Sequence, residues 1–140
     1  MKSNTTANIY RQMDAQCSET QLVLLLLDGA MRFTREAAEH MKAQRWEEKG
    51  RAVESALECI SQLRYGLDHA SGAEVVATLD RTYDFLSTKL AMGNAARDVV
   101  QLEQVVSSLE SLRTAWAELF DRLKTQGRLS RATEDTLAAP

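Results

Sequence analysis

The chain has 140 residues, of which 44% are hydrophobic and 26% are charged, and its formal net charge is −3. This length is enough for one domain with its own core. The charge balance shows no basic stripe, which argues against nucleic acid as a partner. The N-terminus lacks the apolar stretch of a secretory signal, and Cys17 and Cys59 do not have metal-ligand spacing, so we expect a cytoplasmic protein with reduced thiols.

The composition predicts an almost entirely helical chain. Proline occurs once, at the last position, and Leu, Ala, Glu and Arg are abundant. Residues 1–17 are polar and weakly periodic, and they contain one aromatic residue, Tyr10, beside Ile9. We expect this part to be a short N-terminal segment outside the main domain.

The first predicted helix begins at Ser18, where Ser18–Gln21 fits a capping box, and runs to about Ala43. It contains six consecutive apolar residues, Leu22–Leu27, more than the stripe of about 100° that an ordinary amphipathic helix buries. A membrane span needs about 20 such residues. Gly29 costs about 1 kcal/mol relative to Ala inside a helix, which indicates the close approach of another backbone.

The second predicted helix extends from Trp46 to Leu67, with apolar residues at regular helical spacing. A second capping box, Ser71–Glu74, predicts the start of a third helix that runs to about Met92. Gly93 and Asn94 both tolerate the left-handed conformation, so together they predict the end of that helix.

The fourth predicted helix runs from Val99 to about Lys124, with Asp98 as its N-cap and Gly127 closing it. Short connections between four helices of similar length predict an all-α, antiparallel up-down four-helix bundle over residues 18–126. The polar, aperiodic residues 127–140 predict a mobile C-terminal tail.

The fourth helix carries more apolar surface than a bundle core requires. Two adjacent seams cover about 160° of its helical wheel. One seam contains Val99, Leu102, Val106, Leu109, Trp116, Phe120 and Leu123, and the other contains Val105, Leu112 and Leu119. Because a large exposed apolar patch on a monomer usually has a partner, the second seam and the first helix predict a binding surface.

The sequence contains no recognisable catalytic, cofactor-binding or metal-binding constellation. The only histidines are His40 and His69, and neither has a Glu three residues before it, as a di-iron bundle needs. Glu36 and His40, one turn apart, are typical of an exposed pair on a helix surface. The alternatives are a metal ligand pair or a phosphorylated His40 on a phosphotransfer bundle, although the residues after His40 do not fit the latter.

Two aromatic residues allow two interpretations each. Trp116 falls on the apolar seam, which favours a core anchor over a pure ligand contact. Tyr10 lies outside the predicted bundle, where it is either incidental or a removable cover for an apolar patch in the free protein.

Several motifs occur in an order that resembles one known family, the FliS-type flagellar export chaperones. The motifs are Tyr10, Ser18–Glu19, Leu26–Ala30, Leu67–Asp68, Gly72–Glu74, Thr82–Phe85, Leu90–Asn94 and Leu112–Trp116. The chain departs from the family pattern at Glu19, which replaces a Pro, at Leu27, which replaces a Tyr, and at Ala73, which replaces a Gly.

The resemblance implies a cytoplasmic chaperone without enzymatic activity. Such a protein binds the disordered C-terminal segment of flagellin in apolar grooves, prevents premature polymerisation and delivers flagellin to the flagellar type III export apparatus. The binding would be helix-in-groove recognition with coupled folding. We expect a monomer or weak dimer without nucleic-acid binding or membrane insertion. Docking of the export gate or an anti-sigma factor is left open.

The resemblance and the apolar surplus together predict a set of flagellin-binding residues. These are Ile9, Tyr10, Leu22, Val23, Leu26, Leu27, Tyr83, Leu90, Asn94, Val105, Leu112, Trp116 and Leu119. The alternative function is a generic helical module that oligomerises through the same surface, without flagellin specificity.

Overall fold

The computed structural model describes residues 15–138, and side chains within residues 19–127. This part of the chain contains the α-helices α2 (Ala15–Lys42), α3 (Trp46–Tyr65), α4 (Glu74–Ala96) and α5 (Val99–Ala138), with a short 3-10 helix, η1 (His69–Ser71), before α4. No strand occurs within these residues. The predicted all-α four-helix architecture is confirmed.

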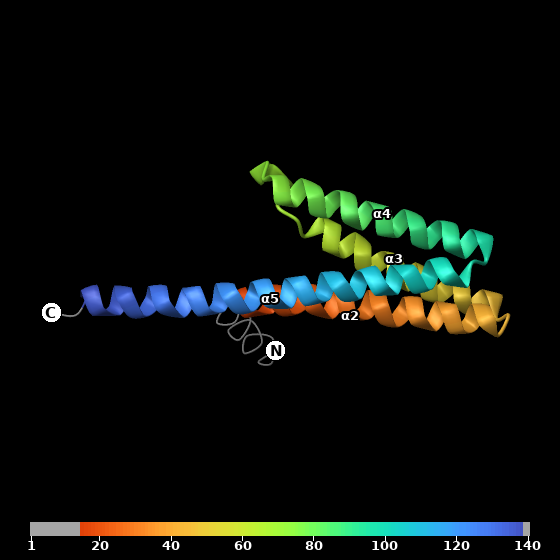
Figure 1. Ribbon diagram of the computed structural model, residues 1–140, viewed down its shortest axis with the longest axis horizontal. Coiled ribbons are helices and arrows are strands. Elements are labelled where there is room, and N and C mark those ends of the chain that lie inside the picture. The colour runs from red at the N-terminus through yellow and green to blue at the C-terminus, as the bar shows by residue number, and fades with distance from the viewer. Residues whose placement is uncertain (1–14, 139–140) are drawn as a thin grey trace, which may run out of the picture.

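The helices pack as neighbours around a square. Helix α2 packs against α3 and α5, and α4 packs against the same two helices, whereas the backbones of the diagonal pairs α2–α4 and α3–α5 lie further apart. Figure 1 shows α2 and α5 running along the long axis of the molecule, while α3 and α4 tilt away from them towards the turn that joins α3 to α4. The bundle is therefore closed at one end and splayed at the other.

The core is made by the inward faces of all four helices. Its largest fully buried side chains include Leu27, Val53, Ile60, Tyr83, Leu86, Leu90, Leu102, Val105 and Leu109. Thr34 is also fully buried, and its hydroxyl donates a hydrogen bond to the Ala30 carbonyl at 2.7 Å. A buried polar group of this kind is tolerated because it has a partner within its own helix.

Several of the predicted helix boundaries differ from the structure. Helix α2 already begins at Ala15, so Ser18 lies inside the helix and is not its N-cap. Before α4, the Ser71 hydroxyl accepts a hydrogen bond from the Ala73 amide at 3.2 Å and stabilises the turn, and the helix itself begins at Glu74. Helix α5 continues through Gly127 to Ala138, because a single glycine weakens a helix without necessarily ending it.

The turn between α4 and α5 corrects one prediction and confirms another. Helix α4 passes through Gly93 and Asn94 and ends at Ala96, with Arg97 in the left-handed conformation at φ 53°. Gly93 is needed for packing, since a Cβ there would lie 2.8 Å from Leu102 Cδ1. Asp98 is the predicted N-cap of α5, and its Oδ1 accepts hydrogen bonds from the backbone amides of the second and third residues after it at 3.1 and 3.4 Å.

Gly29 also has a packing explanation, although not the predicted one. A Cβ at Gly29 would lie 3.1 Å from the Sγ atom of Cys59 on α3. The close neighbour is therefore a side chain and not a backbone. This contact accounts for a glycine in the middle of a long helix.

Candidate functional site

One apolar seam of α5 changes from buried to exposed along its length. Val105 is fully buried, Leu112 is partly buried against the core, and Leu119 is 39% exposed. Leu123, one turn further and on the neighbouring seam, is 52% exposed. The change follows the splay of the bundle, because α4 tilts away from α5 towards this end (Figure 1).

The alignment of α4 with α5 shows which part of α4 lies level with the exposed leucines. Trp116 on α5 donates a hydrogen bond from Nε1 to the Tyr83 hydroxyl on α4 at 2.9 Å. Because the two helices are antiparallel, residues three to seven positions beyond Trp116 lie level with the first two turns of α4. Leu119 and Leu123 are therefore exposed next to the part of α4 that diverges, where most residues are exposed as well.

Helix α2 adds leucines at the same end of the molecule. Arg113 Nε donates to Asp28 Oδ1 at 2.6 Å and aligns α2 with α5. Leu22, six residues before Asp28, is therefore level with Leu119, six residues after Arg113. Leu22 is 52% exposed and Leu25 is 66% exposed. We refer to the exposed Leu119 and Leu123 of α5 as the leucine surface; Leu22 and Leu25 lie at the same level on α2, with Leu25 on the side of that helix turned away from the core.

Trp116 lies between this surface and the core. Its ring stacks on Phe120 with centroids 5.2 Å apart, and both side chains are partly buried. Its partner Tyr83 is almost fully buried; burial raises the pKa of the Tyr83 hydroxyl, and the hydrogen bond with Trp116 partly opposes that rise. Trp116 is thus a core anchor, as its place on the seam predicted, and it also has an exposed part.

Ion pairs connect the helices in two couples. Helix α2 is joined to α5 by Asp28 with Arg113 and by Arg35 with Glu110. Helix α3 is joined to α4 by Arg64, whose Nε donates a hydrogen bond to Asp80 Oδ1 at 3.1 Å and whose Nη1 donates one to Asp84 Oδ1 at 3.1 Å. Ion pairs therefore connect the two helices within each couple. The splay of the bundle separates the α2–α5 couple from the α3–α4 couple.

The structure divides the predicted flagellin-binding residues into three groups. Leu27, Tyr83, Leu90 and Val105 are fully buried core residues, so no partner can reach them in this conformation. Leu22 and Leu119 are exposed, and those with partial burial are Val23, Leu26, Asn94, Leu112 and Trp116. Ile9 and Tyr10 lie outside the described residues.

Leu25 and Leu123 are also exposed; the run Leu22–Leu27 was predicted to form part of the binding surface, whereas Leu123 was not. Leu25 belongs to the six-residue apolar run, and its outward position follows from the helical wheel once the buried residues of α2 are known. Leu123 was assigned to the core seam of α5. The sequence alone carries no signal that the bundle splays before it reaches Leu123.

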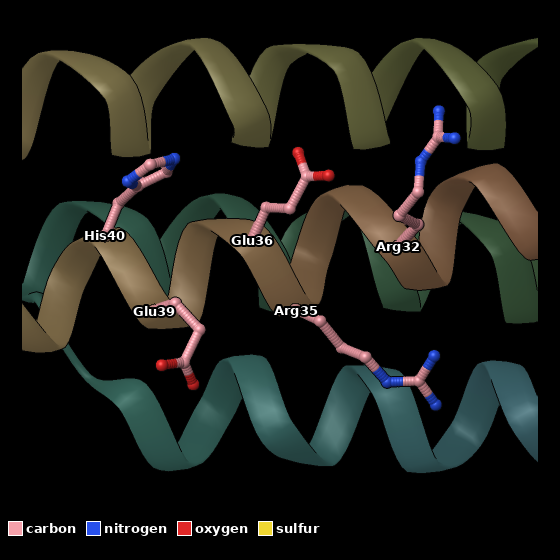
Figure 2. Close-up of a pocket in the computed structure, with 5 residues that line it drawn as sticks. All are labelled: Arg32, Arg35, Glu36, Glu39 and His40. Carbon is pink, nitrogen blue, oxygen red and sulfur yellow. The ribbon is translucent and has the colours of Figure 1, made fainter.

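A shallow hollow on α2 has a different, charged character. It is lined by Arg32, Arg35, Glu36, Glu39 and His40. Figure 2 shows Arg32, Glu36 and His40 pointing towards α3, and Arg35 and Glu39 pointing towards α5.

The interactions of His40 differ from the predicted pairing with Glu36. The His40 Nδ1 atom accepts a hydrogen bond from Arg45 Nε at 3.0 Å. Within the described residues, no group of three His, Cys, Asp or Glu side chains could hold a metal ion. Among the same residues, no helix is long and apolar enough to cross a membrane.

Comparison with known proteins identifies the family. The model of the family described as "Flagellar protein FliS" matches residues 2–123. The chain is 30% identical over 112 residues to flagellar secretion chaperone FliSB of Pseudomonas aeruginosa. These aligned residues are 76% of this chain and 89% of the relative. It is 28% identical over 110 residues to flagellar secretion chaperone FliS of Salmonella typhimurium, covering 78% of this chain and 82% of the relative.

A more distant relative has the same name. Flagellar secretion chaperone FliS of Bacillus subtilis is 26% identical over 98 residues, which are 70% of this chain and 72% of the relative. The family match covers most of the residues that build the bundle, and the relatives span three distinct bacteria. This chain therefore belongs to the FliS family of flagellar proteins.

Proposed function

We propose that this protein is a cytoplasmic export chaperone that binds the C-terminal segment of flagellin on the leucine surface. The bound segment would be kept from premature polymerisation and delivered to the flagellar type III export apparatus. Membership of the FliS family and the names of the relatives support a chaperone of flagellar secretion. The same names support a binding protein and not an enzyme.

The exposed continuation of a core seam is the observation that carries this proposal. Leu119 and Leu123 come after the buried residues of α5, yet both are exposed, towards the end at which α4 tilts away from α5. An amphipathic segment that became helical there would bury them and extend the core by one more element. Ordering a disordered segment costs about 2–5 kcal/mol or more, so the surface must supply several buried apolar side chains.

Calorimetric titration with a synthetic flagellin C-terminal segment tests the proposal. Wild-type protein should bind one segment with a negative heat-capacity change and a gain in helicity. The double variant Leu119→Ser, Leu123→Ser should bind at least tenfold more weakly while it melts close to wild type, because both side chains are already exposed. Absence of binding by a folded wild-type protein would overturn the proposal.

A matched control comes from the other end of the same helix. Val100 is 57% exposed on α5 but lies near the closed end of the bundle. Val100→Ser removes a comparable exposed apolar side chain and should leave the binding of the flagellin segment unchanged. Equal weakening by Val100→Ser would show that the loss reflects general surface polarity and not the leucine surface.

The proposal for Ile9 and Tyr10 is that they cover part of the flagellin-binding surface in the free protein and leave it when flagellin binds. Deletion of residues 1–14 should then raise the association rate of the flagellin segment, since no cover has to be displaced. An unchanged or slower association rate would contradict this role. Ile9→Ser, Tyr10→Ser in the full chain gives the same test without shortening the protein.

Self-association is the alternative use of the same surface. The exposed leucines at this end of α5 could also pair with those of a second copy. Light scattering at increasing protein concentration distinguishes the two. A concentration-dependent mass that the double serine variant removes, without binding of the flagellin segment, would favour the oligomerisation module.

A further inference from the structure

Two cations gather around one indole ring at the closed end of the bundle. This end contains the turn from α2 to α3 and the turn from α4 to α5, which lie side by side in Figure 1. The Arg97 guanidinium carbon is 4.0 Å from the centroid of the Trp46 ring, and Lys49 Nζ is 5.4 Å from the same centroid. Trp46 remains 37% exposed, so a ligand can reach the cluster from solvent.

Lys49 is a buried cation with unused hydrogen-bond donors. Its exposure is 8%, and Nζ donates one hydrogen bond, to the Asn94 backbone carbonyl at 3.0 Å. An ammonium group has three donors, and the described residues satisfy only one of them. Burial lowers the pKa of Lys49, and the charge of Arg97 lowers it further. Both effects disfavour the charged form of Lys49.

The described residues supply no carboxylate for either cation. Neither Lys49 nor Arg97 forms an ion pair within 4.0 Å with any of them. Asp98 follows Arg97 directly, but its Oδ1 atom accepts the backbone amides at the start of α5.

We propose that this cluster is a binding site for a carboxylate group, held between the Lys49 ammonium and the Arg97 guanidinium beside the Trp46 ring. The carboxylate would accept hydrogen bonds from both cations, which are charge-assisted and therefore strong. The exposed part of the Trp46 ring would contact the carbon chain that carries the carboxylate. The carrier is either an acidic residue of a bound polypeptide or a free organic acid.

The surroundings favour a carboxylate over a phosphate. A phosphate dianion is typically held by several free backbone amides at a helix N-terminus. Here Asp98 already accepts the first amides of α5, so those amides are not free for a phosphate. A planar carboxylate needs only the two side-chain donors.

Proton–nitrogen NMR of the two indole groups tests the site directly. Trp46→Phe assigns the two signals, since Trp46 and Trp116 are the only tryptophans. Sodium acetate should shift the Trp46 signal in a saturable way and leave Trp116 unmoved, whereas sodium chloride at the same ionic strength should not. Arg97→Gly should weaken acetate binding at least tenfold, and the fold should persist because glycine suits the left-handed backbone at this position.

A second variant and a second anion complete the test. Lys49→Met keeps most of the buried side-chain volume and removes the charge, and it should abolish the saturable acetate shift. The proposal is overturned if chloride acts like acetate, if Arg97→Gly binds acetate as wild type does, or if inorganic phosphate binds more tightly than acetate.

The same signal identifies the carrier of the carboxylate, and the site itself does not depend on the flagellin proposal. Acetate titration is repeated with the flagellin C-terminal segment bound. Loss of the acetate shift supports the site with the segment as its occupant. A persisting shift supports it with a separate organic acid as the occupant.

Discussion

The indole of Trp116 and the hydroxyl of Tyr83 form a hydrogen bond of 2.9 Å between α5 and α4, at the level where the two helices begin to separate. On one side of this pair the bundle is closed by Leu90, Leu102 and other core residues. On the other side the apolar seam of α5 is exposed. The pair therefore marks the boundary between the structural and the accessible parts of one continuous seam.

Replacement of Trp116 by Phe should destabilise the protein more than replacement of both partners. The single variant leaves the hydroxyl of the buried Tyr83 without its donor, which costs about 1–3 kcal/mol. The double variant Trp116→Phe, Tyr83→Phe removes both polar groups and should recover part of that loss. Urea unfolding followed by circular dichroism measures the difference, and strictly additive losses would contradict a coupled pair.

Acid should remove the contribution of Asp80 to stability. Hydrogen bonds from Arg64 lower the pKa of Asp80 below its ordinary value. Because the folded-state pKa is the lower one, the stabilisation is complete above the unfolded-state pKa of about 3.9 and disappears as the pH falls through the folded-state value. Wild type should thus exceed Asp80→Asn in stability at neutral pH, and the two should converge in acid.

The control for this pH dependence is an exposed aspartate on α5. Asp121→Asn removes a carboxylate that forms no ion pair with the described residues. Thermal melts of the three proteins across a pH series give the comparison. A gap between wild type and Asp80→Asn that stays constant into acid would show that Arg64 does not stabilise the ionised form.

Two glycines in helices should respond to alanine in opposite directions. Gly50 lies inside α3, and a Cβ there would meet nothing within 4 Å. Gly50→Ala should therefore stabilise the protein by about 0.5–1 kcal/mol through helix propensity. Unfolding free energies from urea titration provide the measurement.

Gly93→Ala has the same intrinsic gain but a steric cost. The added Cβ would lie 2.8 Å from Cδ1 of the fully buried Leu102 and 3.0 Å from Gln101 Cβ. Overpacking of this kind costs about 1–3 kcal/mol, so we expect a net loss of stability. A Gly93→Ala protein as stable as Gly50→Ala would show that α4 and α5 can move apart freely at this end.

Cys59 should react slowly with alkylating reagents. Burial raises the pKa of its thiol, and the nearby Arg32 only partly opposes this effect. In a Cys17→Ser variant, the alkylation rate of Cys59 by iodoacetamide should stay below that of free cysteine and should keep rising above the ordinary thiol pKa of about 8.5. Unfolding in urea should restore the free-cysteine rate, and equal rates in the folded protein would contradict the burial of this thiol.

Much of the architecture follows from local sequence. The spacing of apolar residues on each helix, the absence of internal proline and the Asp98 cap are properties of short segments, and they predicted four helices and their order. The motifs also follow one another in the same order as in a known family, and this order indicated the family. These signals are local or depend on order along the chain, so a single sequence contains them.

The tertiary structure decided where the apolar surplus is exposed. Val105 and Leu119 occupy equivalent positions on one seam, yet one is fully buried and the other is 39% exposed. The exposure increases towards the end of the bundle at which α4 tilts away from α5. Gly93 reads as a helix stop in the sequence, whereas the approach of Leu102 makes it a packing residue. The same holds for Lys49 and Arg97, since they are 48 positions apart in the chain and only the fold brings both to one Trp46 ring.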